Sequence, residues 1–146
     1  TGLGWSIMKI DSLDSSITSF NNALNINEEH IDALAGLVLA LYKKGEDLSV
    51  TLFGEQVLLQ DSVYVFEHDT SFNYEDIHLI LADSYNLLGM IEDSQIQVDF
   101  IFPENGLVPD DSASWVVDNI TYSTYEEALT AVIEYLKNLF WNSSSP

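Results

Sequence analysis

The stretch 31–45, IDALAGLVLALYKKG, decides the fold of this chain. Its apolar residues recur at spacings of three and four, which is typical of one broad face of an α-helix. Lys43 and Lys44 fall in the last turn, where the helix dipole favours cations, and Gly45 is a typical helix stop. A helix with so wide an apolar face packs against neighbours on two sides. The apolar set is Ala33, Leu34, Leu37, Val38, Leu41 and Tyr42.

Further helices are predicted on both sides of this stretch. Residues 3–10 and 13–24 precede it, and residues 48–59 follow it. Gly54 lies in the apolar stripe of the last of these helices, which predicts that another helix approaches closely there. The stripes expected to be buried are Leu13, Ile17, Phe20, Ala23 and Leu24 in one helix, and Val50, Phe53, Val57 and Leu58 in the other.

These helices follow a repeat. Leu3 aligns with Leu37, Ile7 with Leu41 and Ala23 with Val57, a shift of 34 residues in each case. Two units related in this way indicate a helix-turn-helix array. A third copy lies in residues 79–94, LILADSYNLLGMIEDS.

With these residues the chain resembles the tetratricopeptide repeat family, whose motif has Leu-Gly, then an aromatic residue, then Gly before the second helix. The chain departs from the family's pattern at Ser16 and Ser94, where a small Ala is usual, and at Glu28, where a closing Pro is usual. The matching residues are Leu3, Gly4, Phe20 and Ala23 in the first unit, Leu37, Tyr42 and Gly45 in the second, and Leu81, Ala82, Tyr85, Leu88 and Gly89 in the third.

The resemblance implies an all-α solenoid of about three antiparallel helix pairs, as a fragment of a larger bacterial repeat protein. Solenoids need atypical terminal units to cover their exposed cores, and the C-terminal third fits that role. The expected divisions are 1–30 (unit 1, N-terminally truncated), 31–64 (unit 2), 65–74 (insertion loop), 75–101 (degenerate unit 3), 102–114 (connector), 115–141 (hairpin and capping helix) and 142–146 (tail).

The predicted C-terminal cap combines a small β-hairpin with a helix. β-Branched and aromatic residues flank Asp118-Asn119, a pair that accepts the positive φ of a two-residue turn. Thr124 and Glu127 have the spacing of a capping box, which predicts a helix over residues 125–140. Its apolar set is Tyr125, Ala128, Leu129, Val132, Ile133, Leu136, Leu139 and Phe140.

The charge of the chain is strongly one-sided. The 146 residues contain 24 Asp and Glu against 4 Lys and no Arg, for a net charge of −20. Nucleic acids and anionic membrane surfaces both require cationic contacts, so neither is an expected partner. No apolar run approaches the length of about 18 residues that spans a bilayer. The acidity favours a solvated surface or, alternatively, attraction to basic partners.

The sequence offers little for catalysis or metal binding. Without cysteine there is no disulfide or thiolate site, and no nucleophile elbow, phosphate loop or dinucleotide fingerprint is present. Glu67, His68 and Asp69 in the insertion loop, together with His78, are the one metal-like grouping. We favour a surface loop whose Asp and His cap the next helix. No catalytic residue, metal or cofactor is predicted.

Proteins of this family usually bind peptides along a concave groove lined by the first helix of each unit. The resemblance assigns to this groove apolar side chains that would anchor a ligand and acidic side chains that would attract a basic one. The predicted function is therefore a protein-interaction scaffold that binds an apolar or basic segment. With no Arg, a clamp for a C-terminal carboxylate is not expected. The groove candidates are Trp5, Met8, Lys9, Asp32, Leu39, Tyr42, Lys43, Asp76, Asp83 and Asn86.

Other functions remain open. The apolar C-terminal helix could fill the groove itself, which would make the chain a structural spacer or assembly module, while an enzyme is the third reading. The apolar edge at Leu3 and Ile7 predicts an upstream unit or self-association. Repeat regions of this family also occur in bacterial envelope proteins, which favours the envelope over the cytoplasm.

Overall fold

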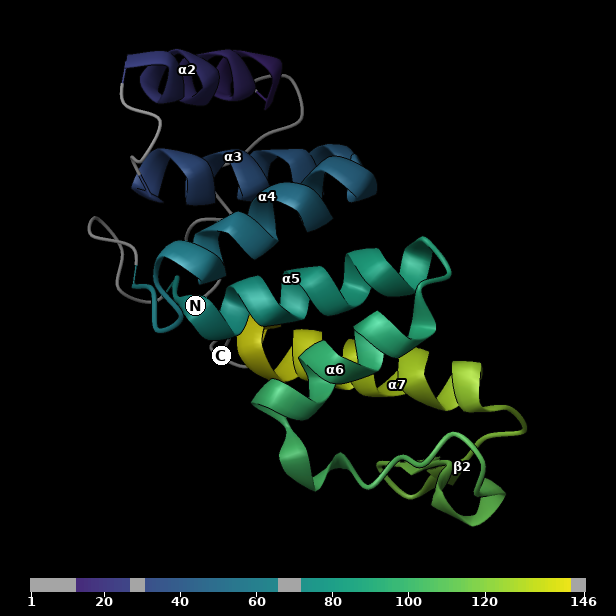
Figure 1. The fold of residues 1–146 in the computed structure, drawn as a ribbon. Coiled ribbons are helices and arrows are strands. Elements are labelled where there is room, and N and C mark those ends of the chain that lie inside the picture. Colours follow the sequence, from purple (N-terminus) through teal and green to yellow (C-terminus); the bar gives the residue numbers. More distant parts are fainter. Residues whose placement is uncertain (1–12, 27–30, 66–71, 143–146) are drawn as a thin grey trace.

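The computed structural model describes residues 13–26, 31–65 and 72–142, and these are mostly helical (Figure 1). Six α-helices and one two-stranded antiparallel sheet occur within these ranges, which confirms the all-α class. Each of the first five helices packs against the next along the chain. The helix predicted over residues 3–10 lies outside the described residues. The five are α2 (Leu13–Ile26), α3 (Ile31–Lys44), α4 (Asp47–Gln60), α5 (Tyr74–Leu87) and α6 (Ile91–Ile101).

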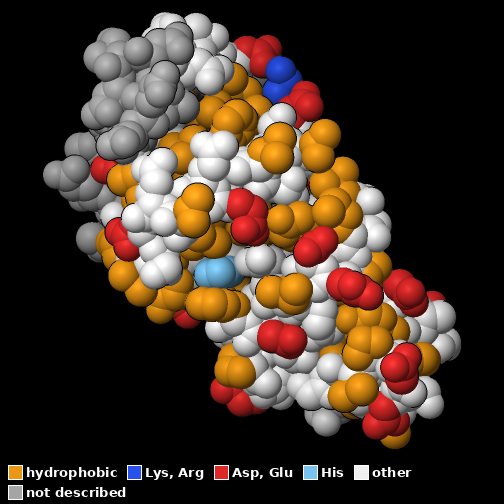
Figure 2. Space-filling model, viewed as in Figure 1, with side chains coloured by type: hydrophobic (Ala, Val, Ile, Leu, Met, Phe, Trp, Pro, Cys, Tyr) orange, Lys and Arg blue, Asp and Glu red, His pale blue; other side chains and the backbone are white. Residues whose placement is uncertain are grey.

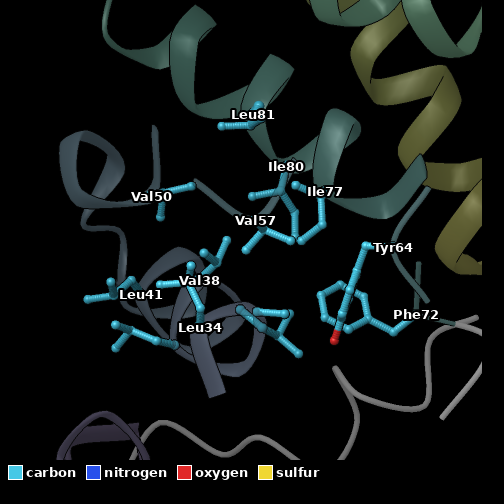
Figure 3. Close-up of a cluster of buried hydrophobic side chains, with 13 residues drawn as sticks. Leu34, Val38, Leu41, Val50, Val57, Tyr64, Phe72, Ile77, Ile80 and Leu81 are labelled. Atoms are coloured by element: carbon cyan, nitrogen blue, oxygen red, sulfur yellow. The ribbon is translucent and has the colours of Figure 1, made fainter. Parts of the chain in front are cut away.

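Helix α3 is the centre of the first hydrophobic core. Every residue from Asp32 to Leu41 is buried, which goes beyond the predicted stripe, whereas Tyr42 of that stripe is only partly buried. The burial is so complete because α2 and α4 both pack against α3, so that few positions are left for solvent. Figure 3 shows side chains of α3, α4 and α5 meeting in this cluster, which Tyr64 and Phe72 close at one end. Its labelled members are Leu34, Val38, Leu41, Val50, Val57, Tyr64, Phe72, Ile77, Ile80 and Leu81.

Glycines allow the ends of two α-helices and close contacts between helices. Gly45 follows α3 with φ +86° and Gly89 follows α5 with φ +79°, a backbone region that residues with a Cβ adopt reluctantly. Gly54 is buried where α4 meets α5, and a Cβ built there would lie 2.7 Å from Leu81 Cδ2. The close approach predicted at Gly54 is therefore confirmed.

Replacing Gly54 with alanine tests this contact. Alanine favours a helix over glycine by about 1 kcal/mol, but the Leu81 side chain that must shift for the new Cβ is fully buried in a close-packed core. We expect a net loss of about 1–2 kcal/mol in the free energy of unfolding, measured by urea denaturation. In a Leu81→Ala background the same substitution should instead be neutral or stabilising. A loss of equal size in both backgrounds would show that the clash is not the cause.

The start of α5 is capped by a residue that the sequence reading did not choose. Asn73 accepts a hydrogen bond from the Glu75 N–H, and Asp76 accepts one from the Asn73 N–H, forming a capping box. The Tyr74 N–H also donates to the Tyr64 carbonyl at 2.7 Å, which closes the base of the loop. The cap predicted from Asp and His is therefore wrong for this helix, because Asn73 occupies the position. Glu67, His68 and Asp69 lie outside the described residues.

The C-terminal third forms a hairpin and a helix, as predicted. The connector contains two short 3-10 turns, Pro103–Asn105 and Ser112–Ser114. Strands β1 (Val116–Val117) and β2 (Ile120–Thr121) pair antiparallel, and Asp118 and Asn119 have φ of 49° and 66° in the turn. Thr124 caps α7 (Tyr125–Lys137) by accepting from the Glu127 N–H at 3.1 Å. A π-helical turn, η4 (Asn138–Asn142), replaces the last predicted α-helical residues.

Helix α7 forms a second hydrophobic core with α5 and α6. Leu79 and Ala82 of α5 and Val98 of α6 are fully buried in it. The predicted apolar set of α7 is buried as far as Leu136, whereas Leu139 on η4 is about half exposed. This core places α7 along α5 and α6, as Figure 1 shows. The buried residues of α7 are Tyr125, Ala128, Leu129, Val132, Ile133 and Leu136.

Candidate functional site

The candidate site is the face of α3 and α5 to which the sequence reading assigned peptide binding. The structure describes seven of the ten groove candidates, and Trp5, Met8 and Lys9 lie outside the described residues. On α5, all three candidates are bonded to the C-terminal segment, which we define as α7 and η4. The described candidates are Asp32, Leu39, Tyr42, Lys43, Asp76, Asp83 and Asn86.

Three polar contacts join α5 to the C-terminal segment from end to end. At one end the Asn86 amide donates to Thr130 Oγ1 at 3.0 Å. In the middle Lys137 Nζ lies 3.2 Å from Asp83 Oδ2. At the other end the Trp141 indole N–H donates to Asp76 Oδ1 at 2.8 Å. Because residue numbers fall along α5 as they rise along the segment, α7 runs antiparallel to α5.

The middle contact is a small polar cluster between three elements. Asp83 is largely buried, and it accepts hydrogen bonds from the Tyr42 hydroxyl of α3 and from Lys137 of α7. Burial and the Asp83 charge raise the pKa of Tyr42, so its hydroxyl stays protonated and donates. Burial would lower the pKa of Lys137, but Asp83 and Glu134 outweigh it and the pKa is raised. The cluster therefore holds an ammonium group against a carboxylate at the interface of α7.

Trp141 joins the two hydrophobic cores. Its ring lies 6.1 Å from the Tyr42 ring, at an interplanar angle of 59°, and it packs against both core clusters. Its hydrogen-bond partner Asp76 is only 2% exposed. Burial raises the pKa of the Asp76 carboxyl from 3.8 to about 6, although the bonds from Trp141 and from the Asn73 N–H oppose the shift. The indole is thus anchored on a carboxyl that is costly to ionise.

The raised pKa of Asp76 predicts a pH dependence of stability. A folded pKa of about 6 above an unfolded value of 3.8 means that the folded chain holds this proton more tightly. The resulting stabilisation is complete below about pH 4 and is lost as the pH rises through 6. Relative to Asp76→Asn, the wild-type chain should lose on the order of 1 kcal/mol in the free energy of unfolding between about pH 5 and pH 8. Urea denaturation across this range measures the difference, and a difference that does not change with pH would contradict the assignment.

Two further candidates, both on α3, are also engaged within the chain. Asp32 accepts a hydrogen bond from the Tyr64 hydroxyl at 2.7 Å, and Leu39 is 4% exposed in the first core. Burial lowers the pKa of the Lys43 ammonium group. Asp32 and Leu39 therefore have structural partners of their own, and neither lies on an open binding surface.

Four partner residues were missed by the sequence reading: Tyr64, Thr130, Lys137 and Trp141. Lys137 carried one usable signal, because it is one of only four cations in the chain and stands on an apolar helix. A cation in such a place needs a carboxylate partner once the helix is buried. Nothing in the spacing of the sequence points from Trp141 to Asp76 or from Tyr64 to Asp32.

His78, the described histidine of the metal-like grouping, is buried against side chains of α6. His78 is 6% exposed, its Nδ1 lies 2.6 Å from Gln97 Oε1, and its ring stacks on Phe100 at 4.2 Å. In the part of the chain that the structure describes, no three His, Asp or Glu side chains gather closely enough to hold a metal ion. His30 lies outside that part.

The described helices include none that is both long enough and apolar enough to cross a bilayer. Comparison of the chain with protein-family models, with curated proteins and with solved structures finds no match.

Proposed function

We propose that this chain is a protein–protein assembly module of tetratricopeptide-like helix pairs. Its inner face, by which we mean the face of α3 and α5 that carries the groove candidates, is occupied by its own C-terminal segment. The observation that carries the proposal is the antiparallel contact of α7 and η4 with α5. It uses Asp76, Asp83 and Asn86, the residues of α5 that a peptide ligand would need. A partner then meets the outside of the module and not its inner face.

The direction of α7 supports a terminal cap. Stacked repeats place corresponding helices in the same direction, so a further unit would run its first helix parallel to α5. Helix α7 is antiparallel to α5 and buries its apolar face against α5 and α6. A capping element of this kind covers the core at the end of an array and stops further stacking.

Locking the segment in place tests the proposal. The chain has no cysteine, so Asn86→Cys and Thr130→Cys create one unique pair that a short bismaleimide can bridge. The control is the same double-cysteine variant with each thiol capped by N-ethylmaleimide, so that no bridge forms. The bridged and the capped chains are immobilised in turn, and the proteins that each retains from an extract of the source organism are compared. For a closed module, both forms capture the same partners. Loss of capture only in the bridged form would show that partners enter the inner face, as an open scaffold requires.

A further inference from the structure

Helix α4 is apolar on its outer side as well as on its core side. Val50 and Val57 face the first core, whereas Leu48, Leu52 and Leu59 are 62%, 59% and 88% exposed. The spacings of four and seven between these leucines place them in one row along the helix. A helix that is apolar on opposite sides is normally covered on both. The outer row of α4 therefore has the character of an interface.

A groove runs beside this row, between α4 and α6. Its volume is about 440 Å³, and its apolar lining includes Leu58, Leu59, Ile96 and Phe100. Ile96 and Phe100 are one helical turn apart on α6, and both are more than half exposed. Figure 2 shows hydrophobic side chains over α4 and α6 with carboxylates among them. The groove has room for several apolar side chains of a partner.

The floor of the groove is polar and internally bonded. His78 contacts the Gln97 carbonyl oxygen, and the Gln97 amide donates to Glu55 at 3.4 Å. The Tyr85 hydroxyl donates to the same Glu55 oxygen at 3.2 Å. These bonds hold the Glu55 carboxylate in the lining of the groove, which also includes apolar side chains of α4 and α6.

One carboxylate, that of Glu55, lines the groove, and those of Asp93 and Glu75 act on groups beside it. Burial, Glu55 and Asp93 together raise the pKa of Tyr85 to about 12, so the Asp93 carboxylate acts on the same group as Glu55. Glu75 and Glu55 both favour a proton on His78, although burial lowers its pKa overall. Among the residues that the structure describes, no lysine lines the groove, and the sequence contains no arginine. An apolar surface that carries carboxylates is complementary to a ligand that is both apolar and cationic.

We propose that the α4–α6 groove binds a cationic amphipathic helix of a partner protein. Apolar side chains of the partner helix would pack on Leu59, Ile96 and Phe100. Its Lys or Arg side chains would form ion pairs with Glu55 and Asp93. The 14 residues of α4 span about 21 Å, which matches a partner helix of similar length. A second copy of this chain is a poorer occupant, because two molecules of charge −20 repel each other. The inference deepens the proposed assembly role by naming the class of partner.

Fluorescence anisotropy with designed peptides tests the groove directly. The probe is a labelled Leu/Lys amphipathic helix, and the control peptide has the same composition in an order without helical periodicity. The chain variants are Leu59→Ser with Ile96→Ser, Glu55→Gln, and Ile120→Ser as the matched control. Ile120 is 55% exposed, close to the 58% of Ile96, and it lies in a different groove between the hairpin and α7. Asp118, Glu126, Glu127 and Glu134 make that groove acidic as well.

The expected result is specific to one groove. The amphipathic peptide binds wild type and Ile120→Ser alike, and the Leu59→Ser/Ile96→Ser chain binds it at least roughly tenfold more weakly. Glu55→Gln weakens binding several-fold at low salt and has little effect at high salt. Equal binding of the scrambled peptide, or equal binding by the Leu59→Ser/Ile96→Ser chain, would overturn the proposal, because charge alone would explain either. Concentration-dependent dimers that Leu59→Ser abolishes would overturn it in favour of a second copy.

The bridged Asn86→Cys/Thr130→Cys chain separates this inference from the proposed function. Peptide binding that survives the bridge and depends on Leu59 supports both. If the bridge abolishes peptide binding and the substitution of Leu59 leaves it unchanged, both proposals are overturned, because the peptide then occupies the inner face. Absence of peptide binding overturns the groove proposal alone and leaves the closure of the inner face standing on the bridged-capture experiment.

Discussion

Replacing Leu129 with alanine lowers the free energy of unfolding by about 2–5 kcal/mol in our account. Leu129 is fully buried at the centre of the second core, where α7 meets α5 and α6. The lost methyl groups leave a cavity that the surrounding helices close only in part. The loss is large because α7 is part of the folded core of the chain. Urea denaturation followed by circular dichroism measures it.

Thr130→Ala is the matched control for this prediction. Thr130 is the next residue on α7, but it is exposed and its contact with Asn86 is a single surface hydrogen bond. The Thr130→Ala substitution should therefore lower the free energy of unfolding by about 1 kcal/mol or less. Similar small losses for Leu129→Ala and Thr130→Ala would mean that α7 contributes little to folding, which contradicts the second core.

Replacing Lys137 with methionine has the second largest expected effect. Methionine keeps most of the apolar stem, but it leaves the Asp83 carboxylate without its ammonium partner in a site where Asp83 is about one-tenth exposed. Breaking a buried ion pair costs about 3–5 kcal/mol, and the partial exposure of Lys137 reduces our expectation to about 2 kcal/mol. Thermal and urea unfolding both measure this loss.

Two further variants isolate the Asp83 charge as the cause. Adding Asp83→Asn to Lys137→Met removes the unpaired charge and should restore most of the lost stability. Glu134→Gln removes only the exposed partner of Lys137 and should change the free energy of unfolding by at most about 0.5 kcal/mol. If the double variant is as unstable as Lys137→Met alone, the loss comes from packing and not from charge.

The helices were predictable from local sequence patterns. Apolar spacing, the glycine after α3, the Asp118-Asn119 turn and the Thr124 cap all act over a few residues, and the structure agrees with each. Gly54 was informative for the same reason, since a glycine among buried apolar residues indicates a close contact. In the stripe predicted for α4, Val50 and Val57 are buried, whereas Phe53 and Leu58 are only partly buried.

The docking of α7 could not be predicted from those patterns. Periodicity shows that α7 has an apolar face, but it carries no information on which helix covers that face or in which direction. The bonds from Trp141 to Asp76 and from Tyr64 to Asp32 join residues far apart in the chain. The family resemblance placed both carboxylates on a ligand-binding surface, whereas each accepts a hydrogen bond from the chain itself.

Cross-linking of engineered cysteine pairs tests the central claim, that α7 lies antiparallel on α5, most directly. One chain carries Asn86→Cys and Thr130→Cys, and the other carries Glu75→Cys and Thr130→Cys. Residues 75 and 86 are separated by about 16 Å along α5, so a short bismaleimide can bridge only one of the two pairs to Thr130→Cys. The account predicts rapid cross-linking within one molecule for the Asn86 pair and none for the Glu75 pair. Faster cross-linking of the Glu75 pair, or products formed only between molecules, would contradict it.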